Sequence, residues 1–203
     1  MRRRRYKQKM RAEQHEQKRD SIVRATVALH AKHGVLATSY PMIAARAKVS
    51  TQTVYNHFPD LGQLVGACTG HVFARAPSVS PDRFSSGKNP EERLRLLADA
   101  VYEQQAFTAP WMRFGWSEAK AVPALGAILS QAAAGMKELI ALALKPERVP
   151  TPEFIDAALA LLDYPGWKRL SQDRSNAAAA ELAGDCLAAL LPVLTRATKQ
   201  EES

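Results

Sequence analysis

The sequence predicts an all-α protein, and three observations support this. Apolar residues recur at helical spacing in one segment after another, glycine and proline fall mainly between those segments, and no alternating run rich in Val, Ile, Thr and Tyr indicates a strand. We expect a basic flexible arm over residues 1–19, a small three-helix domain over 20–66 and a larger helical bundle over 67–203.

The first two helices have clear start and stop signals. Ile22, Ala25 and Leu29 share one face of a first helix. It should end at Gly34, because glycine accepts the left-handed conformation that closes many helices. A short second helix should begin at Ser39, a good capping residue, with Pro41 tolerated in its first turn.

A third short helix is expected after Ser50, which can cap it, with Val54 and Phe58 turned inward. Pro59-Asp60 should then break the chain before a fourth helix that contains Leu64, Cys68 and Val72.

The remaining segments predict the bundle. Residues 77–89 are expected to form a loop, and Asn89-Pro90 to start a helix that an aromatic-rich segment interrupts from Pro110 to Trp116. Further helices are expected over 124–144, from Thr151 to a break at 164–167, and over 176–198, where Pro192 should bend or shorten the end.

Positive charge is concentrated at the N-terminus. The formal net charge is +8, of which residues 1–19 carry +7, residues 20–65 carry +2 and the remainder carries −1. The run begins with four consecutive arginines, Arg2, Arg3, Arg4 and Arg5. Such a cluster is typical of a segment that binds a polyanion, although a solvated arm that only aids solubility has the same composition.

Several classes of protein are not expected. The sequence has no glycine-rich phosphate loop, no nucleophile-elbow serine and no His-Glu-x-x-His pair, so we expect no enzyme. Cys68 and Cys186 are far apart, and His30 and His33 have no evident third ligand, so we expect no metal or cofactor. No apolar run approaches the roughly 20 residues that span a bilayer. With no secretory signal, the expected location is the cytoplasm, with no membrane partner.

Residues 20–66 have the organisation of a helix-turn-helix unit, in which the last helix needs an apolar inner face and a hydrogen-bonding outer face. The expected outer face consists of Thr51, Gln52, Thr53, Tyr55, Asn56 and His57. A solvated helix on a bundle would have a similar pattern, and the basic N-terminus is the observation that favours DNA binding.

This region resembles the DNA-binding domain of TetR-type transcriptional regulators. The resemblance rests on Gly34, Thr38-Ser39, Ile43-Ala44, Ala47, Val49-Ser50, Thr53-Val54-Tyr55, His57-Phe58 and Leu64, with their spacing intact. Residues 161–167 and the Ala/Leu-rich last helix are similar to the final two helices of many members. The resemblance implies a homodimer built on those two helices, an effector pocket inside the body, and repression that a small molecule relieves.

Residue roles follow from the matching positions. Thr51, Gln52 and Asn56 are expected at base edges, since Gln and Asn can pair bidentately with adenine. Phosphate contacts are expected from Ser39, Lys48, Thr53, Tyr55 and His57. For His57 a partly buried structural role is an equal alternative.

Two positions depart from the family pattern. Lys48 replaces the usual glycine of the turn, and Leu61 replaces a lysine at the start of the fourth helix. We expect the basic arm to compensate for that lost phosphate contact, with arginines in a narrow A·T-rich minor groove.

An aromatic cluster in the bundle predicts an effector pocket, because pockets are mostly apolar with a few placed polar groups. The expected lining is Tyr102, Glu103, Phe107, Trp111, Met112, Arg113, Phe114, Trp116, Ile128 and Met136. The same residues at helical spacing also fit an ordinary core.

The last two helices carry more leucine and alanine than a monomer needs, which favours burial against a second copy. The expected function is sequence-specific regulation of transcription on double-stranded operator DNA, as a repressor that a small, largely apolar effector releases. The alternatives are activation, and an architectural protein that coats DNA through its arm with little specificity and no effector.

Overall fold

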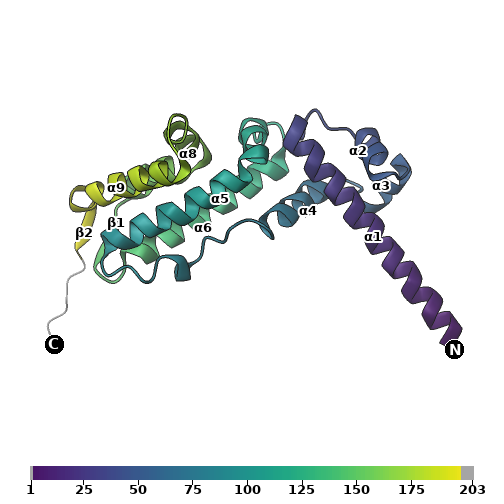
Figure 1. Ribbon diagram of the computed structural model, residues 1–203, viewed down its shortest axis with the longest axis horizontal. Coiled ribbons are helices and arrows are strands. Elements are labelled where there is room, and N and C mark those ends of the chain that lie inside the picture. The colour runs from purple at the N-terminus through teal and green to yellow at the C-terminus, as the bar shows by residue number, and fades with distance from the viewer. Residues whose placement is uncertain (1, 198–203) are drawn as a thin grey trace. The chain divides into compact units, whose positions relative to one another are not determined.

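The computed structural model describes residues 2–197, and the side chains of that range except those of residues 2–5, 7 and 197. Helices make up most of the described chain, which confirms the all-α class (Figure 1). They are α1 Arg2–His33, α2 Tyr40–Ala47, α3 Thr51–His57, α4 Leu61–Phe73, α5 Pro90–Glu118, α6 Pro123–Leu144, α7 Pro152–Leu162, α8 Tyr164–Leu170 and α9 Asn176–Leu194. A 3-10 turn, η1 Pro81–Arg83, lies in the predicted loop.

The chain forms two compact units. The first comprises the residues up to Arg75 together with Pro110–Ala127, and the second comprises Ala76–Ala109 together with the residues from Ile128 onward. This division differs from the predicted boundary after residue 66. Leu64 and Cys68 of α4 belong to the same hydrophobic cluster as α1 and α2, so α4 stays with the first unit.

The basic segment that we predicted to be a flexible arm is instead part of α1, and Figure 1 shows this end of the helix projecting beyond α2 and α3. Arg, Lys, Gln, Glu, Met and Ala are all good helix formers, and the segment contains neither glycine nor proline. Extending an existing helix also costs less than nucleating one. The i,i+4 pair of Lys9 and Glu13, at 3.8 Å, adds a small contribution.

Short-range signals fix the ends of the first helices as predicted. Gly34 has φ 81° and its N–H donates to the His30 carbonyl at 2.9 Å, which ends α1. The Oγ of Ser39 accepts the N–H of Met42 at 3.5 Å at the start of α2. Asp60, expected only as part of a break, caps α4 by accepting the Gln63 N–H at 2.8 Å.

The expected interruption from Pro110 to Trp116 is wrong, because α5 continues through Pro110 to Glu118. Tertiary contacts within the first unit explain this. Trp111 Nε1 donates to the Val27 carbonyl at 2.8 Å, and an Arg113 guanidinium nitrogen donates to the Ala31 carbonyl at 2.8 Å. These contacts to α1 offset the hydrogen bond that an interior proline removes.

The core of the second unit lies between the first part of α5, the end of α6, α7 and α9. Its largest fully buried side chains include Tyr102, Leu97, Ile140, Phe154 and Leu187. The phenolic O–H of Tyr102 donates to the Leu161 carbonyl at 2.9 Å, so this buried hydroxyl is satisfied.

The break predicted at 164–167 is in fact the first turn of α8. Asp163 Oδ1 accepts the Gly166 N–H at 2.9 Å, and Pro165 occupies a position where a missing N–H costs nothing. A Cβ at Gly166 would collide with the Ala160 carbonyl oxygen, so only glycine lets α8 start this close to α7.

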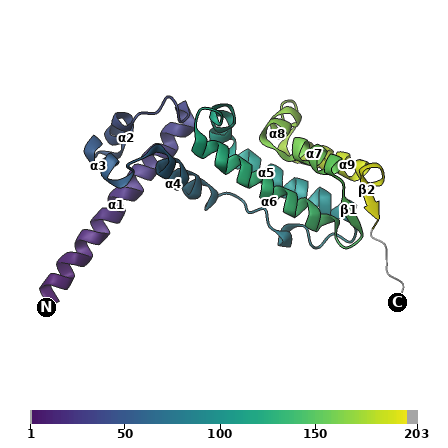
Figure 2. The same ribbon diagram turned by 180° about the vertical axis from the view of Figure 1, so that it is seen from behind.

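The structure also contains two short strands, one after α6 and one after α9. β1 Arg148–Pro150 pairs antiparallel with β2 Thr195–Ala197, with Val149 opposite Arg196 (Figure 2). Neither strand was predicted, because three residues are too few to show an alternating pattern. α9 ends at Leu194, soon after Pro192, as expected of an interior proline.

α6 and α9 are apolar enough, by length and composition alone, to span a membrane, contrary to our expectation. Each carries two charged residues, Lys137 and Glu138 in α6 and Glu181 and Asp185 in α9. Core helices of many non-membrane proteins pass the same test, so neither helix by itself indicates a membrane span.

We expect Gly34→Ala to lower the free energy of unfolding by about 2 kcal/mol. Alanine at φ 81° is strained, and its Cβ would displace the Glu118 carboxylate, which accepts the Val35 N–H at 2.7 Å. Chemical denaturation followed by circular dichroism measures the change. The control is Gly66→Ala in α4, where a new Cβ meets nothing within 4 Å. That change should be neutral or stabilise by about 0.5–1 kcal/mol, and equal losses in both variants would contradict the steric argument.

Candidate nucleic-acid interface

α3 has a buried inner face, as predicted. Val54 is fully buried and Phe58, directly after the helix, is 2% exposed. Both belong to a cluster that includes Ile22 of α1 and Ile43 of α2. The Oγ of Ser50 accepts the Thr53 N–H at 3.1 Å, which caps the helix at the expected residue.

The opposite face of α3 is open to solvent. Gln52, Tyr55 and Asn56 are exposed, and Thr51, Thr53 and His57 are half-buried. Gln52 Nε2 donates to Asn56 Oδ1 at 2.9 Å, so the two amides expected at base edges are adjacent. Each amide keeps further donors and acceptors. The Thr53 hydroxyl is 2.8 Å from Ser50 Oγ and is therefore already engaged in the cap.

Tyr55 lies against a second tyrosine. Its ring centroid is 4.5 Å from that of Tyr40 in α2, and the Tyr40 hydroxyl donates to the Phe58 carbonyl at 3.0 Å. Burial, followed by the nearby Asp60 and Tyr55, raises the pKa of Tyr40, so its hydroxyl stays protonated. This contact ties the beginning of α2 to the end of α3, and Tyr55 remains 49% exposed.

His57 packs on His15 of α1, with their ring centroids 4.2 Å apart. Its Nδ1 is buried and has no hydrogen-bond partner in the described part of the protein. Burial lowers the pKa of His57 most, the neighbouring His15, Arg19 and Lys18 lower it further, and Glu16 acts in the opposite direction. The His57 ring therefore makes a structural contact, which was the alternative to a phosphate contact. The contact with phosphate stays a prediction.

α1 also forms part of this surface, which was not predicted from the sequence. Besides His15, the Arg19 guanidinium lies 5.2 Å from the centre of the Phe58 ring. We had assigned these residues to a separate arm. The signal that could have placed them is helical spacing, since Lys18, Arg19 and Ile22 follow His15 by three, four and seven residues and therefore share one face of a helix.

The turn between α2 and α3 contains a residue with a left-handed backbone conformation. Lys48 has φ 57° and ψ 45°, and it is the one non-glycine residue with positive φ in the described part of the chain. A left-handed conformation costs an ordinary residue about 1–2 kcal/mol. Hydrogen bonds from the N–H groups of Lys48 and Val49 to carbonyls of α2 fix it, at 3.3 and 3.0 Å.

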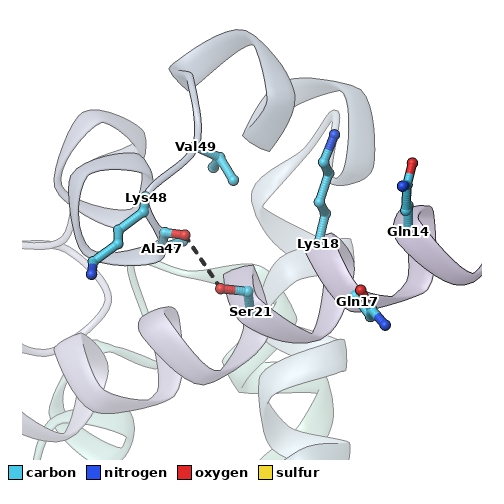
Figure 3. A pocket seen from close by; sticks show the side chains of 7 residues that line it. All are labelled: Gln14, Gln17, Lys18, Ser21, Ala47, Lys48 and Val49. Carbon is cyan, nitrogen blue, oxygen red and sulfur yellow. Dashed lines mark hydrogen bonds between the residues drawn. The ribbon is translucent and has the colours of Figure 1, made fainter.

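Beside this turn, α1 and the end of α2 border an open pocket of about 480 Å³. It is lined by Gln14, Gln17, Lys18, Ser21, Ala47, Lys48 and Val49 (Figure 3). The Ser21 hydroxyl donates to the Ala47 carbonyl at 3.3 Å and joins its two sides. Figure 3 shows Gln14 and Lys18 on the α1 side of the pocket, and the Lys48 side chain pointing away from them. Of these lining residues, only Lys48 was singled out from the sequence as a contact to DNA phosphate.

Two further predictions concern Ser39 and the four N-terminal arginines. Ser39 is exposed, and its hydroxyl serves as the cap of α2. Arg2, Arg3, Arg4 and Arg5 lie in α1, but their side chains lie outside the described residues.

The residues predicted to line an effector pocket are divided between the two units. Trp111, Met112, Arg113, Phe114 and Trp116 belong to the first unit, and Tyr102, Glu103, Phe107, Ile128 and Met136 belong to the second. Several have structural partners. Tyr102 is fully buried in a core, and Glu103 pairs with Arg83 at 2.8 Å. A shared pocket for these residues therefore stays a prediction.

His30 and His33 gain no metal-binding partner. Within the described residues no group of three or more His, Cys, Asp or Glu side chains could hold a metal ion. His30 is buried, and burial lowers its pKa to about 4, so the ring is neutral at physiological pH. Cys68 and Cys186 are free thiols in different units.

The N-terminal region of this chain is similar to a known family of proteins. Residues 22–68 match the family described as bacterial regulatory proteins, tetR family. The HTH-type transcriptional regulator BetI of Burkholderia lata is 30% identical over 113 residues, which cover 53% of this chain and 58% of that protein. The HTH-type transcriptional repressor KstR of Rhodococcus jostii is 32% identical over 85 residues, 42% of this chain and 39% of that protein. The chain thus spans little more than half of the first relative's length and less of the second's.

Solved structures are similar over more of the chain. A TetR-like transcriptional regulator from Rhodococcus sp. RHA1 has a TM-score of 0.61 at 20% identity, covering 85% of this chain and 94% of that one. The multidrug binding protein EbrR, complexed with proflavin, has a TM-score of 0.58 at 23% identity, covering 86% of this chain and 99% of that one. These similarities establish a shared all-α fold.

We expect His15→Ala to raise the pKa of His57. The substitution opens the His57 ring to water and removes the electrostatic effect of the His15 imidazole, and both changes favour the protonated form of His57. A titration of the imidazole protons by NMR measures the shift. His33→Ala, at the other end of α1, should leave the pKa of His57 unchanged, and an unchanged value in His15→Ala would show that the two rings do not interact.

Proposed function

This chain belongs to the tetR family of bacterial regulatory proteins through residues 22–68, and from that premise we propose that it is a sequence-specific DNA-binding regulator of transcription. The observation that supports this most directly is the two-sided α3. Val54 and Phe58 anchor it in a core while Gln52, Tyr55 and Asn56 are exposed. A helix of this kind can enter a major groove only if its inner face is fixed and its outer face is free to bond.

The proposed contacts divide into two kinds. Gln52, Asn56 and Thr51 contact base edges, and the adjacent amides of Gln52 and Asn56 suit recognition of adenine. The residues that contact phosphate and fix the register are Ser39, Lys48, Thr53, Tyr55 and His57. The basic N-terminal end of α1 adds attraction that does not depend on sequence.

The proposed active form is a homodimer through α8 and α9. One stripe of α9, formed by Leu182, Cys186, Leu190 and Val193, is incompletely covered within the protomer, and Val193 is 76% exposed. A second copy would remove this apolar stripe from water. The opposite side of α9 is already occupied, since a Cβ at Gly184 would meet the Arg95 backbone of α5 at 2.9 Å.

The proposed regulation is repression relieved by a small, largely apolar effector in the body. Support comes from one relative described as a transcriptional repressor, KstR, and from the fold that this chain shares with EbrR, a multidrug binding protein crystallised with proflavin. Within the second unit, the candidate contacts are Phe107 of α5 and the half-buried Ile128 and Met136 of α6.

DNA recognition is tested by selecting duplexes from a random pool with the full chain and measuring affinities by fluorescence anisotropy. Gln52→Ala should relax the preference at one base position by about 1–3 kcal/mol, whereas Tyr55→Ala should weaken binding to every duplex. The control is Gln131→Ala, at an exposed position of α6. It should change neither the base preference nor the affinity for DNA.

The selected sequence itself tests the dimer, because a two-fold protein should select two mirrored half-sites. Equal affinity for selected and random duplexes would refute sequence-specific regulation and would support a protein that coats DNA.

The basic end of α1 is tested by deleting residues 2–11, which removes seven positive side chains and no negative one. The dependence of log Kd on log salt should become shallower by about 0.9 for each phosphate contact that is lost. A full-length variant in which Arg2, Arg3, Arg4 and Arg5 are replaced by glutamine keeps the length of α1. It therefore distinguishes the loss of positive charge from the loss of helix length. An unchanged slope in both proteins would show that this segment does not touch DNA.

A further inference from the structure

Two side-chain amides on the outer face of α3 are hydrogen-bonded to each other. Gln52 Nε2 donates to Asn56 Oδ1 at 2.9 Å, and both side chains are exposed. They stand at i and i+4, the spacing at which side chains meet on the surface of a helix. The two amides therefore form one unit in the protein itself, before any base lies against them.

Other polar groups on this face already have local contacts. The Thr53 hydroxyl is 2.8 Å from Ser50 Oγ, in the cap of α3. The Tyr55 ring lies on that of Tyr40, with the centroids 4.5 Å apart. The two amides are the exposed groups of α3 that can match a base edge with a donor and an acceptor side by side.

The direction of the hydrogen bond between the amides determines what Gln52 can offer to a base. An amide has two N–H donors and a carbonyl oxygen that accepts. Gln52 uses one N–H in the pair and keeps the other N–H together with its Oε1. In the major groove adenine presents an acceptor, N7, beside a donor, the N6 amino group. The groups that Gln52 keeps are complementary to that pattern.

We propose that Asn56 is a positioning residue, whose carbonyl oxygen holds the Gln52 amide in the orientation that reads one adenine. The inference rests on the proposed function, because it concerns how α3 recognises a base once it lies in the groove. An unrestrained glutamine amide can turn over, which exchanges its donor and its acceptor. Turning over beside Asn56 Oδ1 would bring two carbonyl oxygens together, so the pair favours one orientation. The NH₂ group of Asn56 stays available to a neighbouring base.

A double-mutant cycle tests whether Asn56 acts through Gln52. Gln52→Ala, Asn56→Ala and the double variant are measured against the selected duplex and against duplexes changed at each single base pair. Asn56→Ala should relax the preference about three- to tenfold at the base pair that Gln52→Ala also relaxes, and the double variant should lose no more there than Gln52→Ala alone. Effects confined to two different base pairs, and additive, would overturn the proposal.

Asn56→Asp is the matched variant, because aspartate keeps an oxygen acceptor for Gln52 Nε2 and removes the NH₂ group. It should retain the preference at the shared base pair, although affinity for every duplex falls because a carboxylate repels phosphate. If Asn56→Asp loses this preference as fully as Asn56→Ala does, the Asn56 oxygen does not position Gln52.

The selected base tests the direction of the bond. With Gln52 Nε2 as the donor, the shared base pair should be A·T, with the adenine facing Gln52. Guanine presents two acceptors in the major groove, N7 and O6. Selection of guanine by the wild-type protein at this position would show that Gln52 offers donors alone, and the proposed orientation would be wrong.

A second arm uses the protein without DNA and measures the motion of side-chain NH₂ groups by NMR relaxation. Asn56→Ala should make the Gln52 amide more mobile. The internal reference is Gln63 of α4, whose Nε2 donates to Asp60 Oδ2 at 2.6 Å and whose mobility should not change. A Gln52 amide that is equally mobile with and without Asn56 would refute the positioning role while specific DNA binding stands. If the wild-type protein selects no duplex, the proposed function fails, and the reading of adenine fails with it.

Discussion

The whole interface depends on the burial of Val54 and Phe58. α3 has seven residues, and a helix of that length is unstable in water without tertiary contacts. The Val54 and Phe58 side chains lie in one cluster with Ile22 and Ile43, which fixes α3 to α1 and α2. Because two residues at i and i+4 set the rotation of the helix about its axis, they also determine that Gln52 and Asn56 are turned outward.

The sequence predicted those parts of the fold that short-range chemistry controls. Ser39, Ser50 and Thr151 each accept a backbone N–H three residues later, so each cap could be recognised without knowing the tertiary structure. The same holds for Gly34, whose positive φ ends α1. The outer face of α3 could be predicted because helical periodicity assigns each residue of a short helix to one side.

Long-range contacts account for what the sequence did not predict. α5 continues past Pro110 because Trp111 and Arg113 bond to α1 carbonyls more than 80 positions away in sequence, at separations of 84 and 82. No local pattern carries that information. The contribution of α1 to the interface was not predicted for a related reason, because its basic residues were interpreted as an independent arm. In one continuous helix, the buried residues from Ile22 onward fix which way the preceding basic side chains face.

The net charge of the N-terminal region overstates the positive charge that is available to a partner. Lys9 is paired with Glu13, an exposed interaction worth a few tenths of a kcal/mol at most. Arg19 lies over the Phe58 ring, where its charge contributes to anchoring the end of α3. Within the described part of the chain, Lys18 has neither kind of partner, and it lines the open pocket between α1 and the end of α2. Neighbouring positions in one basic helix therefore have different roles, and the salt dependence of binding counts only the cations that reach a phosphate.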